Sequence, residues 1–244
     1  PPLVMIPDDP FAQPEKKPEK PGGITQIWIG GENNIPQEMR EWMSGVRACC
    51  RQFSLPYRCL NGRQCKALLD EFGIPFNPTG GIMSLTDMAR VCALKKWGGW
   101  YLDTDVKIQR PAAFHDYSVS VCEQEPSTVF YNAITYGWMY NHGVLYASGD
   151  DSCLFLDAML DACRETYKTV HASDSGWGLE STVQNMVHHD RQWVGWHQGL
   201  PKGVCDCGNP SSMINHVLYG TWYNSAHMTP GIKDAETYSR VSDL

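Results

Sequence analysis

Long apolar runs, an excess of basic residues and paired zinc-type cysteines are all missing from this sequence. No stretch of about 18 consecutive apolar residues occurs, so no segment is predicted to span a membrane. The formal net charge is −7 at pH 7, whereas nucleic-acid-binding domains are usually basic, so nucleic acid is not an expected partner. No internal repeat and no secretory signal peptide is visible. The chain begins with Pro1 rather than Met, which leaves open a fragment whose anchor or second domain lies upstream.

The sequence holds ten cysteines, but none is arranged as C-x-x-C, the spacing typical of zinc sites. Cys49 and Cys50 are adjacent, and Cys205 and Cys207 are separated by one residue, which is too close for an ordinary four-ligand site. Others, such as Cys92, fall among apolar residues of expected helices. We therefore predict mostly free, buried thiols and favour a cytoplasmic location. A few disulfides in the lumen of the secretory pathway are the alternative.

The composition predicts one sizeable domain with an N-terminal tail. Apolar residues make up 42% of the 244 residues, which is ample for a core. Residues 1–23 contain seven prolines and alternating charges, which is typical of an extended linker or stem. Residues 24–244 are therefore predicted to form the folded domain.

The first hundred residues alternate strands with helices. Gly, Pro and capping signals divide them into expected strands at 24–29, 57–60 and 100–102, and expected helices at 36–53, 62–72 and from Ser84 onward. Such alternation predicts an α/β fold with a mostly parallel central sheet flanked by helices. In these folds ligands bind outside the carboxyl ends of the strands.

The pattern is looser after Pro111. A strand is predicted at 119–122, a turn and strand at 141–147, an amphipathic helix at 151–170, and a shorter helix after Gly178. His188, His189 and Asp190 resemble a metal cluster. Because adjacent histidines on a helix point apart, we predict that this group lies on the surface instead.

The stretch from Ser84 to Val106 carries the clearest chemical signal. Ser84 is a suitable N-cap, and Asp87 stands where a capping box places its acid. After Gly98-Gly99, a short apolar strand delivers Asp103 and Asp105 at its end. Two carboxylates one residue apart suit a hard divalent cation with a phosphate beyond it. The alternative is a solvated turn between two strands.

Four ordered blocks resemble sugar transferases of the DXD type, specifically glycosyltransferase family 32 and its neighbours. The blocks are ITQIWIG at 24–30, DMAR through KWGGWYLDTDV at 87–106, NHGVLYA at 141–147 and HVLYGTW at 216–222. A lone D-x-D is a weak signal, but the long central string in a strand-and-helix context is specific. The resemblance implies a single GT-A (nucleotide-diphospho-sugar transferase) domain that forms the catalytic unit.

The resemblance also implies an activity. It implies a hexosyl- or pentosyltransferase that moves a sugar from a nucleotide-diphosphate sugar to a glycan or glycoprotein, with retention of anomeric configuration. A UDP-sugar is favoured over a GDP-sugar. The implied cofactor is Mn²⁺ (or Mg²⁺), held by Asp103, Asp105 and His216, because manganese accepts both carboxylate and imidazole ligands. The alternatives are an inactive carbohydrate- or nucleotide-binding module on this fold, and an ordinary polar role for His216.

In the resemblance, Asp87, Arg90 and Asn141 form the catalytic set around the transferred sugar. The alternatives are an intrahelical ion pair for Asp87 and Arg90, worth a few tenths of a kcal/mol, and a turn cap for Asn141. No side-chain nucleophile is assigned.

The remaining donor contacts follow the same resemblance. The implied donor-binding set also contains Gln26 and Trp28 at the base or ribose, Asp103 at the ribose, and Trp222 as a lid over the diphosphate. The alternatives are ordinary strand positions for Gln26 and Trp28, with Trp28 in the core, and core packing for Trp222. From the whole set we predict that Asp87, Asp105 and His216 converge on one cleft.

Overall fold

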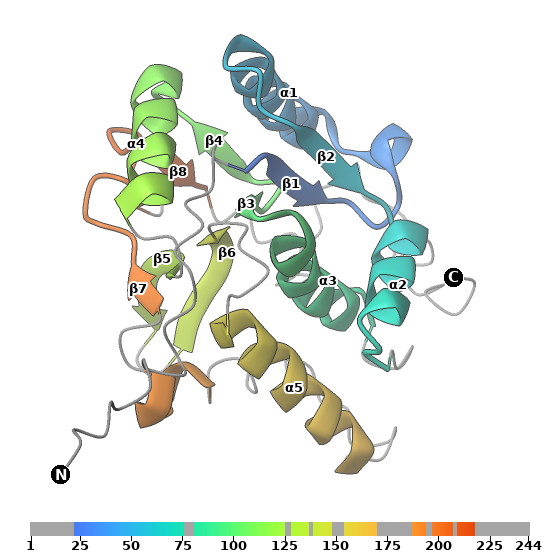
Figure 1. Ribbon diagram of the computed structural model, residues 1–244. Helices are drawn as coiled ribbons and strands as arrows, with labels where there is room; N and C mark the ends of the chain where they lie inside the picture. The colour runs from blue at the N-terminus through green and yellow to red at the C-terminus, as the bar shows by residue number, and fades with distance from the viewer. Residues whose placement is uncertain are drawn as a thin grey trace, which may run out of the picture.

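A mixed sheet with helices on both faces forms the body of the protein in the computed structural model (Figure 1). The structure describes residues 22–75, 81–124, 128–136, 139–147, 154–169, 187–193, 197–206 and 209–217. The main sheet has six strands in the order β2-β1-β3-β6-β5-β7, and a second sheet pairs β4 with β8. The predicted α/β class, a central sheet flanked by helices, is confirmed.

The strands of the main sheet are β1 Ile24–Ile27, β2 Tyr57–Leu60, β3 Gly99–Leu102, β5 Val129–Tyr136, β6 Met139–Ala147 and β7 His197–Gly199. The small sheet consists of β4 Val106–Ile108 and β8 Ile214–His216. The β1–β2, β1–β3 and β5–β7 pairings are parallel, whereas β6 runs antiparallel to both β3 and β5. Parallel pairings therefore predominate, with β6 inserted in the opposite direction.

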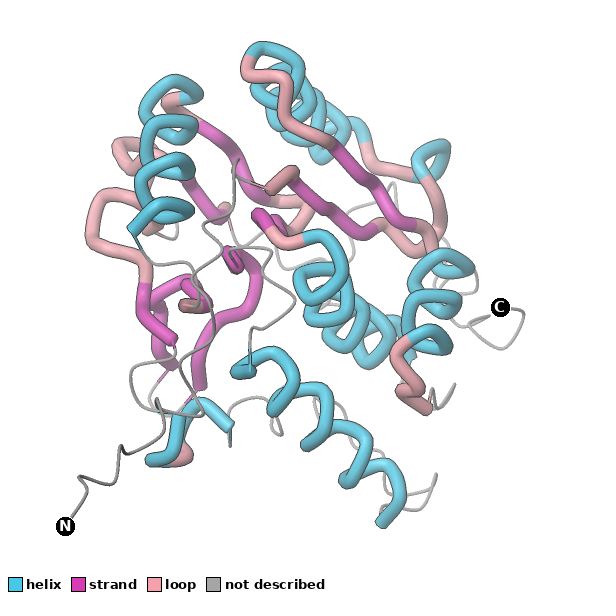
Figure 2. Tube along the Cα trace, viewed as in Figure 1, coloured by secondary structure: helices cyan, strands magenta, loops and turns pink. Residues whose placement is uncertain are grey.

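The helices are α1 Gln37–Gln52, α2 Gly62–Glu71, α3 Gly81–Trp97, α4 Pro111–Gln124 and α5 Leu154–Thr169. Figures 1 and 2 show α2, α3 and α5 together on one side of the sheet, and α1 and α4 on the other. Strand β3 serves both layers: Tyr101 packs into the core beneath α2, α3 and α5, while Trp100 and Leu102 pack into the core beneath α1 and α4. This alternation is the period of two expected for a strand buried on both faces.

Helices α1 and α2 confirm the expected segments to within a residue or two. The capping box of α2 explains its start: the Asn61 side chain accepts from Gln64 N at 2.9 Å, and Gln64 Oε1 accepts from Asn61 N at 2.9 Å. Helix α3 differs from expectation, because it begins at Gly81 and places Ser84 inside its first turn rather than at the N-cap. The apolar spacing extends backward, since Ile82 lies three residues before Leu85.

The strand predicted at residues 119–122 is wrong, because helix α4 covers this segment. The buried side chains Phe114, Ser118, Val121 and Cys122 stand at i, i+4, i+7 and i+8, which is the spacing of one helix face. Pro111 occupies the first helical position, where its missing N–H leaves no hydrogen bond unmade. The run of β-branched and small residues in this segment concealed the helical period.

Two elements predicted after Pro111 are present, and other predicted segments fall outside the described residues. Strand β6 and helix α5 lie where a strand and an amphipathic helix were predicted. Residues 1–21 of the predicted linker, the start of the helix after Gly178, and Trp222 fall outside the described residues. None of the described helices combines the length and apolar character that crossing a bilayer requires.

Buried thiols are a feature of both core layers. All eight described cysteines are free, and seven of them are buried. Burial raises the pKa of the Cys65 thiol to about 12, so this group stays protonated and unreactive at neutral pH. The prediction of free, buried thiols therefore holds for the described cysteines.

Two glycine pairs allow the start of β1 to approach the turn before β3. Gly99 has φ +79°, and Trp100 N donates a hydrogen bond to Gly23 O at 2.9 Å. A Cβ atom on Gly99 would lie 2.2 Å from Gly23 O and 2.5 Å from Gly22 C. Only glycine therefore fits at this position, which sets where β3 begins.

Gly99→Ala is expected to lower the free energy of unfolding by about 1–3 kcal/mol, because alanine is strained at positive φ and must push the Gly22-Gly23 backbone away. Urea denaturation measures this loss. Gly45→Ala in α1 is the matched control, since a Cβ there meets no described residue within 4 Å. That variant is expected to be neutral or stabilised by up to about 1 kcal/mol. Equal midpoints for Gly99→Ala and the wild type would contradict the expected strain.

Candidate metal and donor site

The pairing of β4 with β8 brings the acidic turn after β3 to a distant histidine. Asp103 and Asp105 stand between β3 and β4, and Val106 of β4 is registered with His216 of β8. Val217 N donates to Asp105 O at 3.0 Å, which fixes the two chains side by side at this point. The second sheet therefore places His216 directly at the acidic turn.

Three potential metal ligands meet there. His216 Nε2 lies 3.2 Å from Asp105 Oδ1 and 3.9 Å from Asp103 Oδ2. One ligand atom from each of Asp103, Asp105 and His216 lies within 4.8 Å of the others. His216 is only 3% exposed and Asp105 8%, whereas the Asp103 side chain is 28% exposed, so solvent reaches the cluster from the Asp103 side. Two carboxylates and one imidazole, converging in this way, fit a divalent cation such as manganese.

Arg90 of α3 lies behind these ligands and connects them to Asp87. Its Nη2 is 2.7 Å from Asp87 Oδ1, and its Nη1 is 3.8 Å from Asp103 Oδ1. Nη1 also donates to His142 O at 2.8 Å. The side chains of Asp87 and Arg90 are each only 6% exposed, so this i,i+3 pair is buried and is no ordinary surface pair.

Asp103 is the junction of the cluster. Its Oδ1 accepts from Tyr101 OH at 2.7 Å and faces Arg90, while its Oδ2 faces His216. Burial raises the pKa of the Asp103 carboxyl above its ordinary value, and Arg90 opposes that rise. Such a carboxyl favours a nearby cation. Contacts therefore run from Asp87 through Arg90 and Asp103 to His216. With Asp105, which contacts His216, five of the predicted site residues lie in one connected group.

The strand β1 residues of the predicted donor site are both buried. Gln26 is fully buried, its Nε2 donates to Asp103 O at 3.1 Å, and its Oε1 accepts from Tyr57 OH at 3.0 Å. Trp28 is 8% exposed and belongs to a small apolar cluster with Ile35, Met39 and Met43.

Asn141 lies in β6, registered with Asn132 of β5 and directly before His142. The residue after Asn141 on the same strand, His142, accepts a hydrogen bond from Arg90 through its backbone carbonyl. Sequence reasoning missed Tyr101, although it stands two residues before Asp103 at the end of the same strand. It also missed Tyr57 and His142, whose contacts are made across the sheet.

The prediction that His188, His189 and Asp190 all lie on the surface is wrong for His188. His188 is 3% exposed, whereas His189 and Asp190 are exposed. Adjacent residues do point apart, and one of them therefore enters the core. His188 Nε2 lies 3.2 Å from His142 Nε2, with the rings stacked at a centroid distance of 5.2 Å. One imidazole must donate and the other accept, so the accepting ring must be neutral.

The pH dependence of stability should report this buried contact. Burial, with Arg90 nearby, lowers the pKa of His142 from 6.5 to about 3. Between these values the unfolded chain binds a proton that the folded protein does not. His142 therefore contributes its full stability above about pH 6.5 and loses about 1.4 kcal/mol per pH unit as the pH falls toward 3.

Denaturation at pH 7, 6, 5 and 4 tests this expectation by comparing slopes. His142→Gln should flatten the fall in unfolding free energy by the equivalent of one proton. His189→Gln changes the exposed neighbour of His188 and should keep the wild-type slope. Identical slopes for the wild type and His142→Gln would show that His142 titrates normally when folded.

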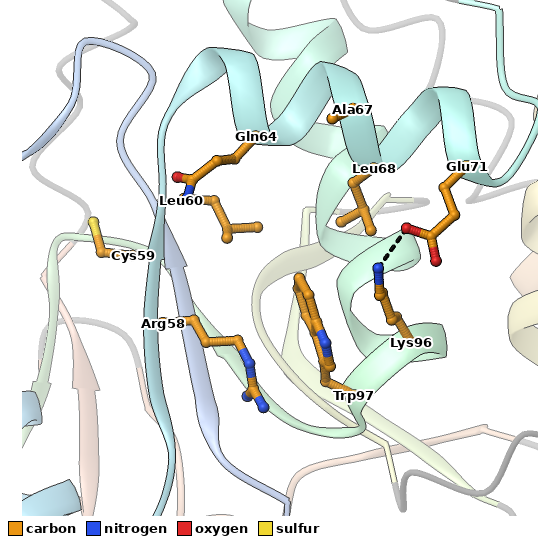
Figure 3. A pocket seen from close by; sticks show the side chains of 9 residues that line it. All are labelled: Arg58, Cys59, Leu60, Gln64, Ala67, Leu68, Glu71, Lys96 and Trp97. Carbon is orange, nitrogen blue, oxygen red and sulfur yellow. Dashed lines mark hydrogen bonds and ion pairs between the residues drawn. The ribbon is translucent and has the colours of Figure 1, made fainter.

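A separate hollow of about 460 Å³ lies between β2, α2 and the end of α3 (Figure 3). Arg58 stacks over the Trp97 ring at 4.9 Å, and Lys96 forms an ion pair with Glu71. The residues that line this hollow include none of the proposed metal ligands Asp103, Asp105 and His216, and neither Asp87 nor Arg90.

Comparisons with known proteins give distant structural likenesses. No protein-family model and no curated protein matches the sequence. One similar solved structure is a glycosyltransferase involved in the glycosylation of the major capsid of PBCV-1, with 12% identity, 90% of this chain and 99% of that chain covered, and a TM-score of 0.48. Another is the PaToxG glycosyltransferase, with 12% identity, 72% of each chain covered and a TM-score of 0.43. Because both identities are 12% and both TM-scores lie below 0.5, the function is inferred from the residues of the site.

Proposed function

We propose that this chain is a metal-dependent glycosyltransferase with a GT-A fold. It transfers a hexose or pentose from a nucleotide-diphosphate sugar, preferably a UDP-sugar, to a glycan or glycoprotein acceptor with retention of configuration. One observation carries this: Asp103, Asp105 and His216 meet at the end of β3, with Arg90 and Asp87 immediately behind them. The string KWGGWYLDTDV around these acids, which resembles the DXD transferases, supports the same function.

The reaction assigns a task to each group. Transfer breaks the bond between the anomeric carbon and the diphosphate oxygen, forms a bond to an acceptor hydroxyl oxygen and releases the hydroxyl proton. A divalent cation at this site supplies charge neutralisation for the departing diphosphate. Asp105, His216 and Asp103 would hold that cation. The burial of Asp105 and His216 strengthens their interactions with charge.

Asp87 and Arg90 would orient the donor sugar, with Asn141 near the transferred group. Arg90 already holds Asp87 on one side and the His142 carbonyl on the other, so the Asp87 carboxylate is fixed in direction. A fixed acceptor can bind sugar hydroxyls without losing further side-chain freedom. Trp28 and Trp222 remain proposed contacts of the nucleotide and diphosphate.

Calorimetry and a turnover screen test the proposal together. MnCl₂ is titrated into the protein, and UDP and GDP are then titrated with and without Mn²⁺. Hydrolysis of a panel of UDP- and GDP-sugars follows. Metal-dependent nucleotide binding with turnover supports the enzyme. Binding without any turnover would indicate an inactive nucleotide-binding module. Nucleotide binding that is absent, or indifferent to Mn²⁺, would overturn the metal-dependent donor site.

A further inference from the structure

We propose that Gln26 is a positioning residue that fixes the backbone of Asp103 for metal binding, and that Tyr57 fixes Gln26 in turn. The inference rests on the proposed metal site. It assigns Gln26 to a different partner from the base or ribose contact that the sequence resemblance implies.

The position of Gln26 in the sheet makes this contact possible. Strand β1 lies between β2 and β3. Its registered pairs with β3 are Ile24↔Trp100 and Thr25↔Tyr101, so the pairing ends just before Gln26. Gln26 Nε2 donates a hydrogen bond to Asp103 O at 3.1 Å. This side-chain bond connects β1 to the residue after β3, beyond the point where their backbone pairing ends.

The chemistry of the contact fixes which way the amide points. A backbone carbonyl only accepts, so the nitrogen of Gln26 must face Asp103 O and the oxygen must face Tyr57. Tyr57 OH donates to that oxygen at 3.0 Å. Both ends of the fully buried amide are thus engaged by protein groups.

The Asp103 backbone is held at both of its polar atoms. Asp103 N donates to Gly143 O at 2.7 Å, and Asp103 O also accepts from Val106 N at 3.1 Å. Gln26 adds a side-chain hydrogen bond to these two backbone hydrogen bonds of Asp103. Because the Asp103 carboxylate must face both Arg90 and His216, a small rotation of its backbone would misdirect the ligand oxygen.

The relay continues outward from Tyr57. The Arg47 guanidinium lies 5.0 Å over the Tyr57 ring, and Arg47 Nη2 pairs with Glu32 Oε2 at 2.7 Å. Glu32 belongs to the short turn after β1. The contacts therefore reach from an exposed turn, through Tyr57 and Gln26, to a metal ligand.

Gln26→Glu is a nearly isosteric probe, because it replaces the amide nitrogen that faces Asp103 O by an oxygen. An ionised glutamate can still accept from Tyr57, but its second oxygen would face the Asp103 carbonyl, where two acceptors repel. Tyr57→Phe removes the outer hydroxyl with little change of shape. Thr25→Val is the matched control: Thr25 is buried next to Gln26 in β1, and its Oγ1 has no hydrogen-bond partner among the residues that the structure describes.

Titration of Mn²⁺ alone, without nucleotide, decides the matter. Gln26→Glu is expected to weaken Mn²⁺ binding about 10–100-fold, the range measured for groups that orient metal ligands. Tyr57→Phe is expected to weaken it by about two- to tenfold, the worth of one hydrogen bond, and Thr25→Val to leave it unchanged. Thermal unfolding in EDTA checks that each variant is folded.

The outcomes separate this inference from the proposed function. Wild-type Mn²⁺ affinity in Gln26→Glu, with UDP binding weakened, would overturn positioning in favour of a nucleotide contact. If Gln26→Glu does not fold, Tyr57→Phe decides: unchanged Mn²⁺ affinity overturns the relay. Absence of Mn²⁺ binding in the wild type itself would instead refute the proposed metal site, and this inference with it.

Discussion

Replacing Asp105 by asparagine is expected to lower kcat/KM for transfer from a UDP-sugar by a factor on the order of 10²–10³, or about 3–4 kcal/mol of transition-state stabilisation. Asp105 Oδ1 is the oxygen nearest to His216 Nε2, at 3.2 Å, so it is central to the ligand set. Asparagine keeps the shape but removes the charge that holds a divalent cation. The loss should accompany a matching loss of Mn²⁺ affinity.

The fold should survive this change. The link between the acidic turn and β8 uses the backbone carbonyl of Asp105, which accepts from Val217 N and is unaffected by the substitution. Asp190→Asn changes an exposed carboxylate and should leave turnover unchanged. Far-UV circular dichroism and thermal unfolding check the fold. Wild-type turnover in folded Asp105→Asn would exclude Asp105 as a ligand of a required metal.

The sequence predicts the first half of the fold well because its signals there are local. Gly98-Gly99 marks the turn into β3, and the Asn61–Gln64 capping box marks the start of α2. The α/β class follows from such alternation of strands and helices. The gathering of Asp103, Asp105 and His216 was predicted from the resemblance to a known family, and could not follow from spacing, because β4–β8 pairing creates it.

Contacts across the sheet account for most of what sequence reasoning missed. The bond from Gln26 to Asp103 joins residues 77 positions apart, and no local pattern marks it. His188 was misassigned because its neighbour His189 has the same side chain, and only tertiary packing distinguishes the buried ring from the exposed one. In α4, the side chains alternate between apolar and polar around Ser120, which is typical of a strand. The side chains that the structure buries there nevertheless have helical spacing.

Arg90→Met is expected to destabilise the protein by about 3–5 kcal/mol, as loss of one partner from a buried ion pair does. Without the guanidinium, Asp87 loses its 2.7 Å partner, and the His142 carbonyl loses a donor at 2.8 Å. Urea denaturation at pH 7 measures the change. Lys66→Met is the matched control, because Lys66 pairs with Asp70 at 2.9 Å on an exposed helix surface. There we expect a loss below about 1 kcal/mol.

A second substitution separates stability from transfer. Asp87→Asn in the Arg90→Met background removes the carboxylate that lost its partner, so part of the lost stability should return. Turnover should not return, because the proposed donor-sugar contact of Asp87 is removed together with Arg90. A fall in stability no larger than that of Lys66→Met would instead identify Asp87 and Arg90 as an ordinary intrahelical pair. Recovery of turnover with stability would remove both residues from the proposed catalytic set and leave them a structural role behind Asp103.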